Sequence, residues 1–166
     1  YKLLRDLASC SGVVTPGFYG EMPDGHIKTF SRGGSDITGA LAAAALDADV
    51  YENWTDVSGI LMADPRIVEN PLPIPEVTYD ELRELSVSGA QVLHEGTIFP
   101  VREKDIPLNI RNTNAPQDPG TLIQERFDTD DHPQRFITGI TGRKDFSVVS
   151  LTKRGFSGEV GFLRRV

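Results

Sequence analysis

Segments with strand-like spacing of apolar residues alternate with segments of helical spacing over the first 124 residues. The pattern predicts strands over 13–18, 27–30, 50–54, 107–111 and 121–123. It predicts helices over 1–9, 36–46, 78–89 and 97–104, the second of them rich in alanine. Alternating strands and helices indicate an α/β layer structure.

Local signals mark where several of these elements begin and end. Thr78 and Glu81 have the spacing of a capping box at the start of a helix. Pro100 falls inside the last predicted helix, which therefore begins late or is kinked there. Residues 22–25, Met-Pro-Asp-Gly, predict a turn, and a proline-rich stretch runs over 71–75.

An acidic linker divides the chain. Residues 128–133, Asp-Thr-Asp-Asp-His-Pro, follow the last strand of the α/β region. Beyond them, 136–141 and 147–152 have strand character, and a helical stripe begins at Val160. We therefore divide the chain into an α/β region over 1–124, a linker over 125–135 and the start of a second domain over 136–166.

Composition narrows the function classes. The formal net charge of −7 disfavours nucleic acid as a partner. The longest apolar run, Ala40 to Leu46, is far short of the roughly 18 residues of a membrane span, and no signal peptide is recognisable. Cys10 is the single cysteine, so no zinc site or internal disulfide is predicted, and we expect a cytoplasmic protein. The first residue is not methionine, and both ends suggest a piece of a longer protein.

The most informative motif is Arg32-Gly33-Gly34-Ser35-Asp36, between a predicted strand and a predicted helix. Two glycines allow a ligand to approach the backbone closely, and a helix N-terminus favours anions. An arginine there can bind a carboxylate or phosphate with two hydrogen bonds. The alternative is a plain helix cap, with Ser35 or Asp36 as the N-cap residue.

Three further segments carry candidate chemistry. Residues 55–59, Thr-Asp-Val-Ser-Gly, leave a strand at its carboxyl end, where α/β sheets bind ligands, although a simple turn would look the same. Residues 64–66, Asp-Pro-Arg, place Arg66 over phosphates or form a surface ion pair. In 89–94, Gly-Ala-Gln-Val-Leu-His, a lone His94 is more often structural than catalytic.

In order and spacing, these segments together with Pro119-Gly120-Thr121-Leu122-Ile123 resemble the aspartate kinases of the amino acid kinase family. The resemblance covers about residues 13–123. It implies the later, nucleotide-binding part of a three-layer α/β/α kinase domain. It also implies that 136–166 open a ferredoxin-like ACT domain, in which the loop 153–158 would meet an end-product amino acid such as lysine or threonine.

The implied reaction transfers the γ-phosphoryl group of ATP, with Mg²⁺, to the side-chain carboxylate of L-aspartate. That carboxylate is ionised at neutral pH, so positioning and charge neutralisation suffice for catalysis. The resemblance gives Arg32 and Asp36 catalytic roles and assigns aspartate binding to Arg32, Gly33, Gly34, Ser35 and Asp36. It assigns nucleotide contacts to Thr55, Asp56, Leu61, Asp64, Arg66 and Gln91, and it implies no protein-held metal.

Two positions depart from the family pattern. Leu61 stands where many relatives have a tyrosine against the nucleotide, and Gln91 stands where many have a lysine. A glutamine brings no positive charge to a phosphate, so its assignment is the weakest. The glycine-rich lysine segment that opens the family's catalytic domain has no counterpart here. We therefore expect the chain alone to be inactive, and we expect it to form a homo-oligomer.

Two other functions stay open. One is a related kinase that phosphorylates a different carboxylate. The other is a regulatory subunit that carries the effector domain without catalysis.

Overall fold

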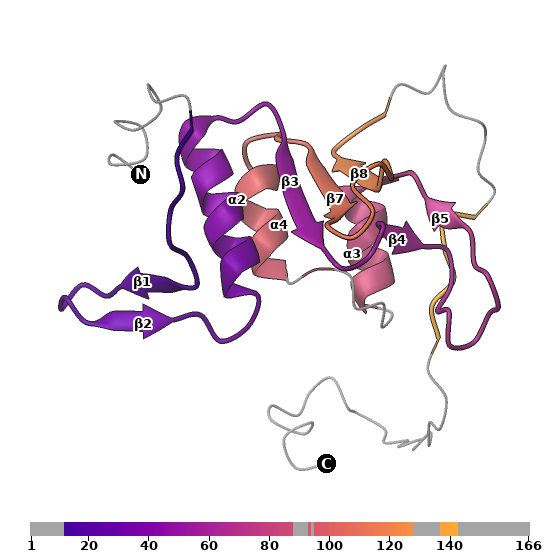
Figure 1. The fold of residues 1–166 in the computed structure, drawn as a ribbon, viewed down its shortest axis with the longest axis horizontal. Coiled ribbons are helices and arrows are strands. Elements are labelled where there is room, and N and C mark those ends of the chain that lie inside the picture. The colour runs from indigo at the N-terminus through magenta and orange to yellow at the C-terminus, as the bar shows by residue number, and fades with distance from the viewer. Residues whose placement is uncertain (1–11, 88–92, 94, 128–136, 143–166) are drawn as a thin grey trace, which may run out of the picture.

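The computed structural model describes residues 12–87, 93, 95–127 and 137–142 (Figure 1). Several predictions fall outside this part of the chain. They concern the helix over 1–9, Gln91, His94, the linker from 128 onward and the elements beyond 142.

A four-stranded mixed sheet forms the centre of the described chain. Its spatial order is β3 (Tyr51–Thr55), β7 (Leu108–Asn112), β8 (Thr121–Gln124) and β6 (Glu76–Thr78). β3 and β7 are parallel, β8 is antiparallel to β7, and β6 is parallel to β8. The strands predicted at 50–54, 107–111 and 121–123 are confirmed to within one residue at each end. The sequence pattern does not predict β6, because its one apolar residue, Val77, stands between Glu76 and Thr78 just after the proline-rich stretch.

One face of this sheet carries the core. In-register neighbours on that face include Asn53 with Ile110, and Leu108 with Ile123. The helices α2 (Gly34–Leu46), α3 (Tyr79–Val87) and α4 (Glu95–Arg102) pack there, and their apolar residues join the strands in one cluster. The predicted α/β class is confirmed. No helix in the described ranges is long and apolar enough to cross a membrane.

The connection from α2 to β3 fixes where ligands can bind. α2 ends at Asp47, whose left-handed backbone allows its N–H to bond the carbonyl of Ala43. The chain then reverses, so that α2 begins at the end of the sheet where β3 finishes (Figure 1). Four small buried alanines let α2 lie close to its neighbours. The first turn of α2 and the loop after β3 therefore meet at one edge.

Two predicted boundaries are wrong. The strand expected over 13–18 is absent from the described chain. β1 (Tyr19–Glu21) begins later, because Pro16 and Gly17 interrupt the earlier stretch. β1 pairs with β2 (Ile27–Thr29) across the predicted turn, in which the Gly25 N–H donates to the Met22 carbonyl at 2.9 Å. α4 begins at Glu95, earlier than predicted, because the helix accommodates Pro100 in its second turn.

The proline-rich stretch, for which no strand was predicted, contains a paired strand. β4 (Ile60–Leu61) and β5 (Pro73–Ile74) form an antiparallel pair, extended by a bond from the Met62 N–H to the Leu72 carbonyl at 2.8 Å. This pairing holds the intervening loop, 63–71, at the edge of the domain. Proline tolerates such an edge position because the missing N–H is not needed there.

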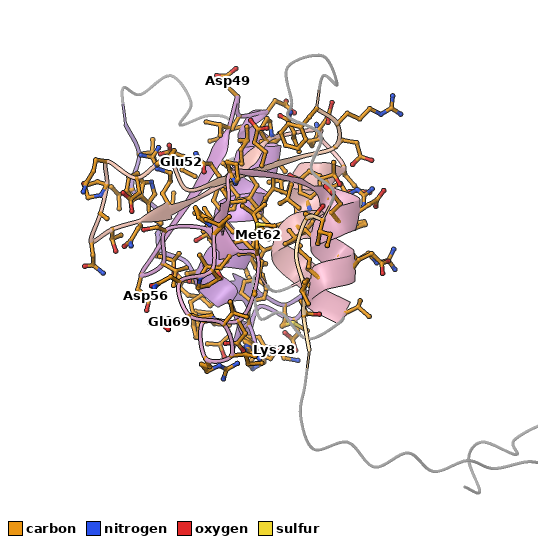
Figure 2. The ribbon with its side chains drawn as sticks, turned by 90° about the vertical axis from the view of Figure 1, so that its right-hand side faces the viewer. Lys28, Asp49, Glu52, Asp56, Met62 and Glu69 are labelled. Carbon is orange, nitrogen blue, oxygen red and sulfur yellow. The ribbon has the colours of Figure 1, made fainter. Side chains whose placement is uncertain are left out.

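Residues 137–142 lie against the β4–β5 pair and the start of α3. The strand predicted over 136–141 is wrong for its described part, because these residues make one backbone bond here instead of a ladder. The Ile140 N–H donates to the Met62 carbonyl at 2.7 Å, and Met62 lies near the centre of the view in Figure 2. Thr138 Oγ1 donates to Glu81 Oε1 at 2.6 Å. A segment distant in sequence therefore packs beside the β4–β5 pair.

The predicted capping box of α3 is confirmed. The Glu81 N–H donates to Thr78 Oγ1 at 3.2 Å, and the Thr78 N–H donates to Glu81 Oε2 at 2.9 Å. We expect Thr78→Ala to lower the free energy of unfolding by about 1 kcal/mol, because one helical N–H loses its acceptor. Urea denaturation measures this, with exposed Thr15→Ala as the control. Equal stability of the two variants would contradict the capping role.

Candidate functional site

A cavity of about 640 Å³ opens where α2 begins and β3 ends. This volume is typical of sites for small ligands. Its walls come from the first turn of α2, from β3 and the loop after it, from the loop after β4, and from residues 140–142. Six of the predicted site residues line it, namely Ser35, Asp36, Thr55, Leu61, Asp64 and Arg66.

The first turn of α2 presents backbone N–H groups that have no side-chain cap among the described residues. Gly33 precedes the helix with φ 60°, and no side chain caps it. The Ile37 N–H makes the first helical bond, to the Gly33 carbonyl at 2.9 Å, so the N–H groups of residues 34–36 precede that ladder. The alternative that Ser35 or Asp36 is the N-cap is therefore wrong, since both lie inside the helix. An uncapped N-terminus at a cavity favours an anion.

The two glycines of this motif shape the turn without lining the cavity. Gly33 has a left-handed backbone, which glycine adopts without strain. A Cβ on Gly34 would lie 2.8 Å from the ring of Phe18. Arg32 is exposed and is absent from the cavity wall. The structure thus brings Ser35 and Asp36 to the cavity and leaves the other three predicted substrate residues outside it.

Tyr51 supports the first turn of α2 from the sheet. Its hydroxyl donates to the Asp36 carbonyl at 3.1 Å. Burial, and secondarily the charge of Asp36, raise the pKa of Tyr51 to about 12, so it remains a neutral donor at physiological pH. Asp36 lines the cavity. Its Oδ1 accepts one long hydrogen bond, from Ser35 Oγ at 3.5 Å.

At the end of β3, only one of the two predicted residues faces the cavity. Thr55 lines it, and its Oγ1 donates to Asp56 Oδ1 at 3.2 Å. Asp56 is exposed and points outward in Figure 2. The Thr55 carbonyl accepts from the Thr113 N–H at 2.8 Å and from its Oγ1 at 2.9 Å, which ties this end of β3 to the loop after β7.

Asp64 and Arg66 form the ion pair that the sequence left as an alternative. Arg66 Nη2 lies 2.6 Å from Asp64 Oδ2, and Arg66 Nε lies 2.9 Å from Asp64 Oδ1. The hydrogen bonds from Arg66 lower the pKa of Asp64 to about 2, and the same pairing raises the pKa of Arg66. Arg66 is mostly exposed at the cavity mouth. The pair leaves the remaining guanidinium hydrogens available for a second anionic partner.

A polar network holds the loop after β3 against the loop before β8. Ser58 Oγ donates to Asp118 Oδ2 at 2.6 Å and accepts from Asn112 Nδ2 at 2.9 Å. Thr121 Oγ1 accepts from the Ile60 N–H at 2.7 Å and donates to the Ile74 carbonyl. This network explains the motif that ends at Ile123: its residues fix the cavity wall and do not line the cavity.

Sequence reasoning missed several cavity residues. Asn53 and Trp54 line the cavity, and the Arg111 guanidinium lies 5.0 Å from the centre of the Trp54 ring. The signal for Asn53 was a polar residue at an inward position of a strand. Residues 140–142 carried no usable signal, because they come from a distant segment. No group of three or more metal-ligating side chains occurs among the described residues.

Comparison with known proteins shows which family this chain is similar to. The pattern described as the amino acid kinase family matches residues 3–112. Aspartokinase 3 of Bacillus subtilis is 42% identical over 166 residues, which is 99% of this chain and 36% of the relative. The chain spans 36% of the length of that relative, and 26% of Aspartokinase 1, chloroplastic, of Arabidopsis thaliana, which is 36% identical over 92% of this chain.

Solved structures agree with this match. Aspartate kinase from Clostridium acetobutylicum is 57% identical with a TM-score of 0.76, over 84% of this chain and 32% of that one. Aspartokinase III of Escherichia coli, in complex with aspartate and ADP, is 40% identical with a TM-score of 0.62, over 68% of this chain and 25% of that one.

Proposed function

Since the chain belongs to the amino acid kinase family, we propose that it forms the nucleotide-binding part of an aspartate kinase. The reaction transfers the γ-phosphoryl group of ATP to the side-chain carboxylate of L-aspartate. One observation carries the proposal: a single cavity joins the uncapped first turn of α2 to the Asp64–Arg66 pair and the end of β3. Phosphoryl transfer relies mainly on such positioning and charge neutralisation.

The two ends of the cavity suit different parts of the reactants. Backbone donors at residues 34–36 suit anionic oxygens at the transfer point, and Asp36 suits a cation beside them. Thr55, Leu61, Asp64 and Arg66 suit the nucleotide, with Arg66 on its phosphates. Arg32, Asp56 and Gln91 complete the proposed set by resemblance to the family. Mg²⁺ enters as part of the nucleotide substrate, and two carboxylates at the cavity fit its preference for oxygen ligands.

Nucleotide binding tests this proposal on the chain itself. Trp54 is the only tryptophan in the sequence and it lines the cavity, so its fluorescence reports a ligand there. We expect a saturable change on titration with MgATP or MgADP and none with UTP at equal concentration. A response to neither adenine nucleotide would contradict the proposed function.

Arg66 provides a specific prediction. Arg66→Ala is expected to weaken MgATP binding about tenfold or more, because a charge-assisted hydrogen bond to phosphate is lost. Arg66→Lys should recover part of the affinity, since it keeps the charge without the planar fork. Arg83→Ala, on the exposed face of α3, is the control. The low pKa of Asp64 keeps the pair ionised, so this contribution should not titrate between about pH 5 and 8.

Regulation and assembly extend the proposal. The tail from residue 136 resembles the start of an ACT domain, so we propose that lysine or threonine acts on the complete protein as an end-product effector. In the described residues β3 pairs only with β7, and an open strand edge favours association, so we propose a homo-oligomer. Light scattering tests the assembly, and titration with each amino acid tests the effector.

A further inference from the structure

Asn53, in the middle of β3, is a buried polar residue whose side-chain amide nitrogen has no hydrogen-bond partner among the described residues. Its exposed fraction is 7%, and its Nδ2 has no partner in the described chain. Its inward-facing neighbour on β7 is Ile110, which is also buried. A β-branched apolar residue would suit this position better than a carboxamide. The polar group therefore needs a reason other than packing.

Another polar residue on the same face shows what a structural role looks like. Thr121 on β8 is fully buried, and its hydroxyl both accepts from the Ile60 N–H and donates to the Ile74 carbonyl. The Asn53 side chain makes no such contact within the described part of the chain. Among the described residues, four buried side-chain atoms lack a partner, and only that of Asn53 belongs to a residue that lines the cavity. Because Asn53 lines the cavity, its carboxamide is within reach of a ligand bound there.

The position of Asn53 indicates which ligand group it meets. β3 ends beside the first turn of α2 (Figure 1). Asn53 and Ser35 line the same cavity. The free backbone donors of that turn favour anionic oxygens. A carboxamide adds a neutral donor, which reaches such an oxygen without a further charge. Nδ2 itself is buried in the structure, and because the two ends of an amide have nearly the same shape, a half-turn about its last bond brings Nδ2 to the cavity side.

We propose that Asn53 is a positioning residue, which donates a hydrogen bond from Nδ2 to a terminal phosphate oxygen of the nucleotide held at the first turn of α2. The inference rests on the proposed function and deepens it. It assigns Asn53 to the transferring phosphate, whereas the family resemblance assigned it no role.

The test compares stability with ligand affinity in two Asn53 variants. Asn53→Leu has similar size and removes the unpaired amide, so we expect an equal or higher midpoint of thermal unfolding. We expect its affinity for MgATP, measured by calorimetric titration, to fall tenfold or more, with binding of adenosine unchanged. Asn53→Asp should lose more MgATP affinity than Asn53→Leu, because its charge repels phosphate. Gln117→Leu, an exposed carboxamide outside the cavity, is the control.

Results that differ from these expectations would overturn either the role of Asn53 or the proposed function. If wild type binds MgATP and Asn53→Leu binds it equally well, the role of Asn53 is wrong while the proposed function stands. An equal loss with adenosine, or a loss confined to aspartate, would assign Asn53 to another group and overturn the phosphate contact. If Asn53→Leu does not fold, Asn53→Asp and Asn53→Ser provide the same comparison. Failure of wild type to bind MgATP would overturn both proposals.

Discussion

Replacing Gly120 with alanine is expected to lower the free energy of unfolding by about 4 kcal/mol or more. Gly120 has φ 77°, a conformation that strains other residues. A Cβ there would overlap the Ile110 carbonyl oxygen and lie 3.0 Å from the carbonyl carbon. Ile110 pairs with Thr121 in the β7–β8 ladder, so neither backbone can move away without breaking the sheet. Urea unfolding followed by circular dichroism measures the change.

Gly20→Ala is the matched control for this prediction. Gly20 lies in β1 with φ in the ordinary range, and a Cβ added there would meet nothing within 4 Å. Its substitution should change stability by less than about 0.5 kcal/mol. A Gly120→Ala protein as stable as the Gly20→Ala protein would show that the close approach of β7 to residue 120 is wrong.

The second large effect concerns catalysis by the polypeptide that the complete gene encodes. Asp36→Asn is expected to reduce kcat/KM for aspartate about 100-fold, which corresponds to about 2.7 kcal/mol of transition-state stabilisation. Asp36 lines the cavity in the first turn of α2, where its neighbours favour anions. A carboxylate in that place fits a cation, either the substrate's ammonium group or phosphate-bound Mg²⁺. Asparagine keeps the shape and removes the charge.

Asp49→Asn controls for the loss of one negative charge. Asp49 is exposed and lies toward the end of the molecule opposite Asp56 (Figure 2). Its variant should keep activity within about twofold of wild type. Steady-state kinetics on the two variants separate a local effect from a global one, and an Asp36→Asn enzyme with near-normal kcat/KM would refute the role of Asp36.

Sequence patterns predicted elements whose signals are local. β3 and β7 follow from apolar residues, and the start of α3 follows from Thr78 and Glu81. β5 and β6 escaped prediction because their pairing joins segments far apart in the chain, and short strands with proline lack a pattern of their own. The contact between Ile140 and Met62 was not predicted either, because it joins two segments that are far apart in the sequence.

The candidate site divides in a similar way. Ser35, Asp36, Thr55, Asp64 and Arg66 belong to contiguous motifs at element ends, and the structure brings them to one cavity. Spacing alone cannot tell which residues of a motif face inward. Arg32 and Asp56 show this, since both are exposed and outside the cavity wall. Asn53 was overlooked because its role depends on what its neighbours leave unsatisfied, and only coordinates show that.

The most direct test of the central claim is the ATP-dependent formation of acyl hydroxamate by the polypeptide that the complete gene encodes. Aspartate, glutamate and N-acetylglutamate are assayed in parallel, because each would give an acyl phosphate that hydroxylamine traps. We predict product with aspartate alone. Product with one of the other acids would identify a different carboxylate kinase, and no product with any of the three would contradict a catalytic role and favour a regulatory subunit.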